Sequence, residues 1–249
     1  MENNSSLQSA FDLCHTAYDL TVSKAKVLYS IAILNYLIGI PLVLLAVFAV
    51  GVGYAGYYVG GLRGIIIAVA IGIVALIVMV GLSIWIQVAL LEAVINNIGF
   101  KESFKIAKGK VVSYLITSLI AGLIVFLGFI IFIVPGIIFI VWYGFAAIVV
   151  VAEGLRGMAA LRQSKSYVKG RWGAVAWRLA APILGLFLLQ IIIALVFDRQ
   201  IGGIIRLIVS FLAIPFLIAY HYLLYKNLKD TVYIEAPMAP TVSSNETPS

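Results

Sequence analysis

The stretch that decides the fold is residues 111–152, VVSYLITSLIAGLIVFLGFIIFIVPGIIFIVWYGFAAIVVVA, a run of 42 residues without Asp, Glu, Lys or Arg. A bilayer core of about 30 Å is crossed by about 20 helical residues, because each residue adds about 1.5 Å. The run therefore predicts two crossings with a reversal between them. Pro135 disfavours helix at Val134, and Gly136 tolerates the backbone angles of a tight turn, so we expect the reversal at residues 133–136.

Uncharged runs elsewhere complete a polytopic pattern. With residues 111–152 they predict six helices, at about 27–50, 64–91, 111–133, 136–152, 174–197 and 204–225. The glycine-rich residues 51–61 are expected to form a loop between the first two. The composition agrees, since 63% of the 249 residues are hydrophobic and only 11% are charged, against about 25% charged in a soluble domain. We predict an all-α, polytopic integral membrane protein with six transmembrane helices and short amphipathic interfacial helices.

The chain divides into an N-terminal segment, residues 1–26, a transmembrane domain, residues 27–225, and a tail, residues 226–249, which is rich in Pro, Ser and Thr and is predicted to be disordered. The N-terminal segment is expected to be a retained amphipathic helix in the membrane plane. Its apolar stripe is Leu7, Ala10, Phe11, Cys14, Ala17 and Tyr18. Asp12 and Asp19 on its polar face are expected to reach the basic loops.

Lys and Arg are distributed unequally between the two sides that six helices create, with 13 on the side of the termini and three, Arg63, Arg199 and Arg206, on the other. Positive charge retained near helix ends favours the cytoplasm, so both termini are expected there. The asymmetry also explains the net charge of +7 without nucleic acid as a partner. The expected partners are membrane lipids, and either a second copy of the chain or another membrane protein.

The two long cytoplasmic loops share a skeleton that suggests an internal repeat, with the second loop longer by four residues. Four motifs in this part of the chain resemble one family, and they are Val134-Pro135-Gly136-Ile137, Glu153-Gly154, Ala160-Leu161 followed by Ser164, and Lys169-Gly170-Arg171-Trp172. They resemble the membrane domain of some glycerophosphoryl diester phosphodiesterases and of many stand-alone bacterial and archaeal membrane proteins. The resemblance implies a plasma-membrane location.

Fused members of that family carry a separate soluble phosphodiesterase barrel, for which this chain has no room, so the resemblance does not imply catalysis here. The inventory of reactive residues agrees: His15 and His221 are the two histidines, Cys14 is the single cysteine, and HExxH and GxSxG motifs are absent from the sequence. We therefore expect no catalytic residue, no cofactor and no metal. Structural roles are expected for the family-motif positions Pro135, Gly136, Glu153, Gly154, Leu161, Ser164 and Gly170.

Two roles are considered for Glu153. It could be a binding or proton-relay group, or it could be a helix-end residue that pairs locally with Arg156, and we expect the second. Two functions stay open for the whole chain. One is a non-enzymatic membrane protein that supports or organises envelope or partner proteins, and the other is a small permease or lipid-handling protein. A carrier needs a cavity lined by the polar residues of the spans, which include Asn35, Gln87 and His221, whereas a scaffold should have a filled apolar interior.

Overall fold

The computed structural model describes residues 7–235, which form ten α-helices and no strand within that range. In chain order the helices are α1 (Ala10–Ser23), α2 (Ala25–Gly60), α3 (Leu62–Asn96), α4 (Phe100–Ala107), α5 (Val111–Ile131), α6 (Ile133–Tyr143), α7 (Ala146–Glu153), α8 (Met158–Val168), α9 (Trp172–Val196) and α10 (Arg199–Glu235). Six segments are long and apolar enough to cross a membrane, which confirms the all-α polytopic architecture.

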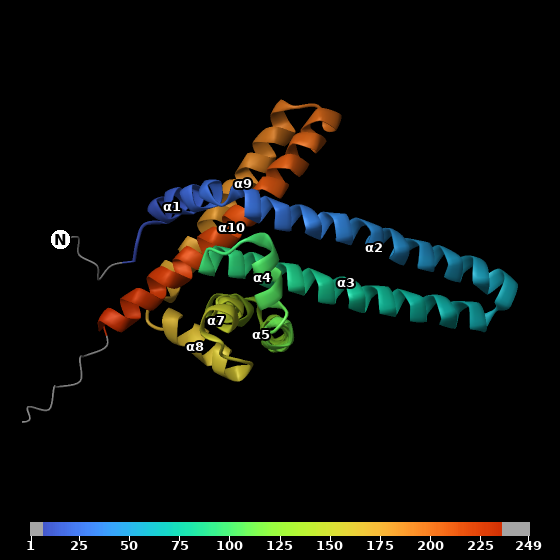
Figure 1. Cartoon of the computed structure of the whole chain (residues 1–249), viewed down its shortest axis with the longest axis horizontal. Helices are drawn as coiled ribbons and strands as arrows, with labels where there is room; N and C mark the ends of the chain where they lie inside the picture. Colours follow the sequence, from blue (N-terminus) through green and yellow to red (C-terminus); the bar gives the residue numbers. More distant parts are fainter. Residues whose placement is uncertain (1–6, 236–249) are drawn as a thin grey trace, which may run out of the picture.

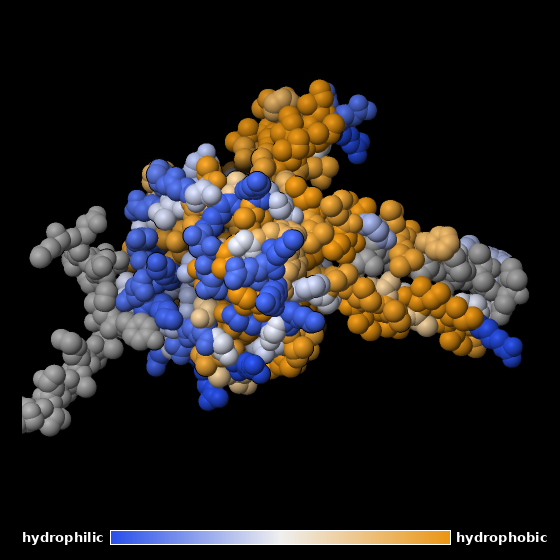
Figure 2. Space-filling view, in the orientation of Figure 1, coloured by the Kyte–Doolittle hydropathy of each residue, from blue (hydrophilic) through white to orange (hydrophobic). Residues whose placement is uncertain are grey.

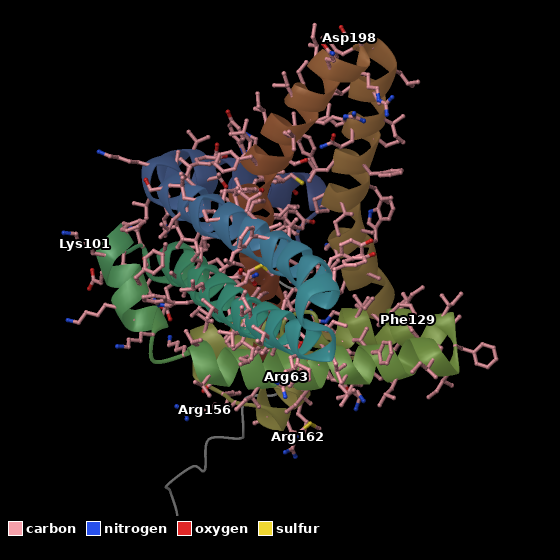
Figure 3. All side chains as sticks on the ribbon, turned by 90° about the vertical axis from the view of Figure 1, so that its right-hand side faces the viewer. Arg63, Lys101, Phe129, Arg156, Arg162 and Asp198 are labelled. Carbon is pink, nitrogen blue, oxygen red and sulfur yellow. The ribbon has the colours of Figure 1, made fainter. Side chains whose placement is uncertain are left out.

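Three helical hairpins, α2–α3, α5–α6 and α9–α10, diverge as arms from a common base (Figures 1 and 3). The view turned by 90° shows the α5–α6 arm, which carries Phe129, and the α9–α10 arm, which ends at Asp198, pointing in different directions (Figure 3). Only 6–18% of the most apolar stretch of each candidate span is buried within the protein, except for Ile133–Glu153, where the share is 39%. The arms therefore present their apolar surface outward, as lipid-facing segments do.

The base consists of α1, α4, α7 and α8 with the adjoining ends of α3, α5, α9 and α10, and it contains the main packed core. Side chains from most of these helices meet there, among them Leu13, Ala107, Val149, Tyr167 and Leu224, each with at most 1% of its surface exposed. Hydrophilic residues cover the base, while the arms are apolar up to their tips (Figure 2). Lys101, Arg156 and Arg162 lie at the base, and Arg63 lies at the tip of the α2–α3 arm (Figure 3).

The α2–α3 arm differs from the expected loop at residues 51–61. Helix α2 continues through this glycine-rich segment to Gly60, and the reversal takes place at Gly61 alone, which has φ +57°. Residues 51–61 carry no charge that would end the helix, and lipid offers no partner for a backbone group freed from it. Helix formation therefore prevails over the glycine propensity.

The α5–α6 reversal is also shorter than predicted. Phe132 makes the turn by itself in an extended conformation, and Pro135 lies in the first turn of α6, where a missing N–H leaves no intrahelical bond unmade. Gly136 is helical and buried, so it does not supply turn angles. A Cβ atom at Gly136 would lie 2.5 Å from the Phe129 ring, which shows that this glycine allows α5 and α6 to approach closely.

The two ends of the chain correct two further expectations. Residues 226–235, predicted to be part of a disordered tail, continue α10, and Leu228 and Thr231 in this extension are buried. Residues 236–249, the remainder of that predicted tail, lie outside the described part of the chain. Helix α1 forms as predicted, but Leu13, Ala17 and Thr21 are its buried residues.

The predicted stripe of α1 has two surroundings, since Ala17 is buried and Leu7 and Cys14 pack against the core, whereas two other members face outward. Phe11 and Tyr18, two members of the predicted stripe, are 80% and 61% exposed. Asp12 accepts from Ser9 Oγ at 2.6 Å, and Asp19 lies 3.1 Å from His15, so both carboxylates are engaged within the helix and not with the basic loops. The packing of α1 on α10 decides which residues are buried.

Candidate functional site

A cavity of about 480 Å³ lies where α2, α3, α5, α7 and α10 meet. Its polar lining is Asn35, Gln87, Tyr114 and His221, and aliphatic side chains such as Leu90 and Ile218 form the rest of the wall. Ligand sites of this size commonly combine an apolar wall with a few polar groups. Asn35, Gln87 and His221 belong to the polar set that the sequence offered for a carrier, and the structure brings these three together.

A break in the fourth span forms one wall of the cavity. Predicted as one helix over 136–152, this span divides into α6 and α7 at Gly144 and Phe145. A Cβ atom at Gly144 would lie 2.9 Å from the Ile140 carbonyl oxygen, so a larger residue would disturb the break. Gly144 and Ala147, both small, consequently line the cavity and leave it open on this side.

Helix α10 supplies the opposite wall and contains Pro215 next to the lining residue Ile214. A proline inside a helix removes one backbone hydrogen bond and weakens the preceding turn. The Tyr29 hydroxyl donates to the Leu212 carbonyl in that turn at 3.0 Å. This bond joins α2 to α10.

His221 lines the cavity and has a buried ring nitrogen without a partner in the described part of the chain. Its Nε2 atom is buried and has no hydrogen-bond partner among the described residues, while its ring packs against Phe145 at a centroid distance of 4.9 Å. Gln87 and Tyr114, by contrast, are hydrogen-bonded to each other at 3.3 Å. An unpaired buried nitrogen lowers the stability of the fold by about 1–3 kcal/mol, so we expect His221 to hydrogen-bond to a bound molecule.

An ion pair joins the fully buried Glu92, which follows the lining residue Leu91, to Lys110, whose side chain is 31% exposed. Lys110 Nζ lies 2.6 Å from Glu92 Oε1 and forms an ion pair with it. Asn96 Nδ2 donates to Glu92 Oε2 at 2.6 Å, and Lys110 Nζ donates to the Val151 carbonyl at 2.7 Å. Glu92 is completely buried. Its pair with Lys110, together with the bond from Lys110 to the Val151 carbonyl, links α3 and the start of α5 to α7.

A second charged cluster surrounds Glu153, the residue for which we expected a local pair with Arg156. Its Oε1 atom instead accepts from Tyr167 of α8 at 2.6 Å and from Tyr225 of α10, and Lys229 Nζ lies 3.2 Å away. Glu153 therefore links α7 to α8 and α10 through contacts with residues distant in the sequence. The local pairing expectation was wrong because Gly154, with φ +73°, ends α7 and turns the chain away from it.

The two clusters occupy equivalent places in the suggested repeat. Residues in equivalent places are 61 positions apart, and they include Glu92 and Glu153, Ser103 and Ser164, Gly109 and Gly170, and Lys110 and Arg171. Both serines are fully buried in short helices, α4 and α8. The connection between α7 and α9, residues 154–171, is four residues longer than the connection between α3 and α5, residues 97–110, as the sequence predicted. In the second unit Arg171 donates to Thr231 of α10 at 2.6 Å, and Lys229 approaches the glutamate.

The remaining family-motif positions lie at helix ends and in the packed base. Ser164 Oγ donates to the Trp142 carbonyl at 2.7 Å, and Leu161 is 1% exposed. Gly170 has φ +83° where α8 ends, a conformation that L side chains rarely adopt. Pro135 and Gly136 lie in the α5–α6 arm, apart from the base, so the motif residues do not converge on one site.

Lysines also cap two helix C-termini in the base. Lys24 Nζ donates to the Val94 carbonyl at 3.0 Å near the end of α3, as Lys110 does near the end of α7. Cations are favourable there because the last carbonyls of a helix lack intrahelical partners. Burial lowers the pKa of Lys24. Within residues 7–235, no three His, Cys, Asp or Glu residues group in a way that could hold a metal ion.

Sequence reasoning missed Glu92, Lys110, Tyr114, Tyr225 and Lys229. A usable signal existed for the first, since Glu92 and Asn96 are four residues apart and would share a helix face if the span ran past Leu91. Comparison with protein-family models, curated proteins and solved structures finds no match to this chain. The resemblance to the phosphodiesterase membrane domain therefore stays a prediction.

Proposed function

We propose that this integral membrane protein binds a small molecule in its central cavity and acts as a small permease or lipid-handling protein. The observation that carries the proposal is the 480 Å³ cavity lined by Asn35, Gln87, Tyr114 and His221 at the junction of five helices. A broken span at Gly144 and a proline-containing helix next to the cavity support it, because discontinuous helices commonly frame transporter sites.

A scaffold for envelope or partner proteins would have a filled interior, and the cavity weighs against that role. The proposal includes no catalytic step.

It does include an orientation in the plasma membrane with both termini in the cytoplasm. Support comes from the gathering of hydrophilic residues at the base, while Arg63 lies at an arm tip (Figures 2 and 3). Anionic lipid around the basic base follows from that orientation.

The test is to identify molecules retained by the protein after gentle extraction from native membranes, using mass spectrometry. Wild type is compared with Ala147→Phe, which fills the cavity from the α7 side, and with Ala194→Phe, which adds the same bulk on the exposed face of α9. We expect a molecule that wild type and Ala194→Phe retain in near-stoichiometric amount and that Ala147→Phe loses.

Thermal unfolding of all three proteins in the same detergent accompanies the measurement, so that loss of the molecule is separated from loss of the fold. Equal retention by wild type and a folded Ala147→Phe variant would place the molecule outside the cavity. A wild-type protein that carries nothing specific would overturn the proposed function.

A further inference from the structure

We infer that the cavity selects an uncharged amphiphile, with a hydrogen-bonding head group held at His221 Nε2 and an apolar body against the aliphatic wall. This inference rests on the proposed function and narrows it to a ligand class. It concerns His221, Gln87, Tyr114 and Asn35, together with the ion pair of Glu92 and Lys110.

The first step is the absence of free charge at the cavity. Its lining, as described, contains no Asp, Glu, Lys or Arg. The nearby charges of Glu92 and Lys110 pair with each other. Glu92 also accepts from Asn96, and Lys110 also donates to the Val151 carbonyl. A charged ligand would lose its hydration without gaining a counter-ion, which costs far more than burial of a hydroxyl group.

The second step is the choice of His221 as the recognition residue. The Tyr114 hydroxyl already donates to Gln87 Oε1, at 3.3 Å. His221 lines the same cavity, and its Nε2 has no partner among the described residues but almost no accessible surface, so the ring must turn slightly for a ligand to reach it. A ligand hydroxyl can either donate to or accept from an imidazole nitrogen, so it satisfies Nε2 in either tautomer.

The third step is the apolar remainder of the wall. Leu90, Leu91, Ile148, Ile214 and Ile218 surround the polar groups, so a ligand that is polar throughout would leave most of its own groups unpaired. A hydroxylated head group with an alkyl chain satisfies both parts of the wall. The bilayer around the arms supplies molecules of that class.

The experiment uses two photo-crosslinking probes with the same diazirine-bearing oleoyl chain, one a monoacylglycerol and the other a free fatty acid that is ionised. The full-length protein is reconstituted in phosphatidylcholine nanodiscs, and crosslinked peptides are mapped by mass spectrometry. We expect the monoacylglycerol probe to label α3 and α10 at the cavity, in competition with unlabelled monooleoylglycerol, and the fatty-acid probe to label it at least tenfold less.

Two substitutions test His221 itself. His221→Phe keeps a ring against Phe145 but removes both nitrogens, and it should weaken monoacylglycerol labelling by about 5- to 150-fold, the loss expected for a buried hydrogen-bond partner. His221→Gln keeps a polar group and should stay within about threefold of wild type. Melting temperatures of both variants check that they fold.

Several results would overturn the inference. They are equal or stronger labelling by the fatty acid, unchanged labelling of His221→Phe, or crosslinks confined to the outer faces of the arms. Failure of both probes on a protein that retains a different molecule from native membranes would refute the ligand class and leave the proposed function standing. Failure of both probes on a protein that retains nothing would refute both.

Discussion

Glu92 carries a charge in the packed base although it is completely buried, and Lys110 lies 2.6 Å from it. Taking two charges out of water is costly, so such a pair contributes little net stability relative to apolar residues of the same size. Removing one partner is different, because the other charge then stays buried without compensation. The pair is therefore a sensitive probe of the base.

We predict that Lys110→Met destabilises the protein by about 3–5 kcal/mol, since it leaves the Glu92 carboxylate unpaired. The double variant Glu92→Met with Lys110→Met should recover a large part of that loss. Thermal unfolding in detergent measures both, with Lys101→Met at the exposed surface of α4 as the matched control. A single variant as stable as its control would show that the pair is not buried.

Glu153→Gln gives a second test at the same scale. As an exposed helix-end charge, Glu153 would contribute about 0.3–1 kcal/mol. Its contacts with Tyr167, Tyr225 and Lys229 instead predict a loss of about 1–3 kcal/mol, because two buried hydroxyl donors lose their anionic acceptor. The melting temperature is compared with that of Glu102→Gln on exposed α4, and a loss no greater than the control's would contradict the tie to α10.

The sequence identified single polar residues but not their partners. Glu153 stood out by its motif, yet its partners come from positions 14 and 72 residues later, Tyr167 and Tyr225, and helical spacing carries no information about such contacts. Glu92 was missed because charge was taken to end the span, whereas the pair with Lys110 lets α3 continue to Asn96. Tertiary pairing decides the position of these residues.

At the scale of elements, hydropathy located every span, because a continuous apolar run of sufficient length has few alternatives in lipid. The turns were less predictable. Glycine at residues 51–61 favours a loop in water, but α2 crosses the segment and reverses at Gly61. Pro135 and Gly136 marked the α5–α6 hairpin correctly, yet they follow the turn and do not form it.

Helix α1 shows the same limit and gives a prediction. Its spacing predicted an amphipathic helix and placed Ala17 on the apolar face, but it left out Leu13, which is also buried in the core that α1 shares with α10. We predict that Leu13→Asp releases α1, seen as rapid trypsin cleavage after Lys24, whose ammonium otherwise bonds to the Val94 carbonyl. Phe11→Asp, at a side chain that is 80% exposed, should leave cleavage close to the wild-type rate.

The comparison between the two α1 variants is made in detergent at matched charge, since both introduce one aspartate. Equal sensitivity of Leu13→Asp and wild type would mean that α1 does not depend on α10. Rapid cleavage of Phe11→Asp alone would restore the face that the sequence predicted. Arg178, which donates to the Leu7 and Gln8 carbonyls at 3.0 and 2.7 Å, holds the start of the segment in either variant.

At the scale of the molecule, three apolar arms meet a polar base, and the cavity lies where the arms join it (Figures 1 and 2). The sequence supplied Asn35, Gln87 and His221 of the polar lining, but not Tyr114, and it supplied the criterion that separates a carrier from a scaffold. The sequence could not predict that a cavity forms between these residues. That depends on the break at Gly144 and on the way α2, α3 and α10 approach one another.

The most direct test of the account is the reactivity of one cysteine in that cavity. In a variant with Cys14 replaced, Ala147→Cys at the cavity and Val149→Cys in the fully packed core lie two residues apart on α7. Reaction with N-ethylmaleimide is followed by mass spectrometry in nanodiscs. The account predicts that Ala147→Cys reacts at least tenfold faster than Val149→Cys and that Ala147→Cys with His221→Phe stays equally reactive. Equally slow reaction at both positions would show a filled interior and contradict a ligand-binding cavity.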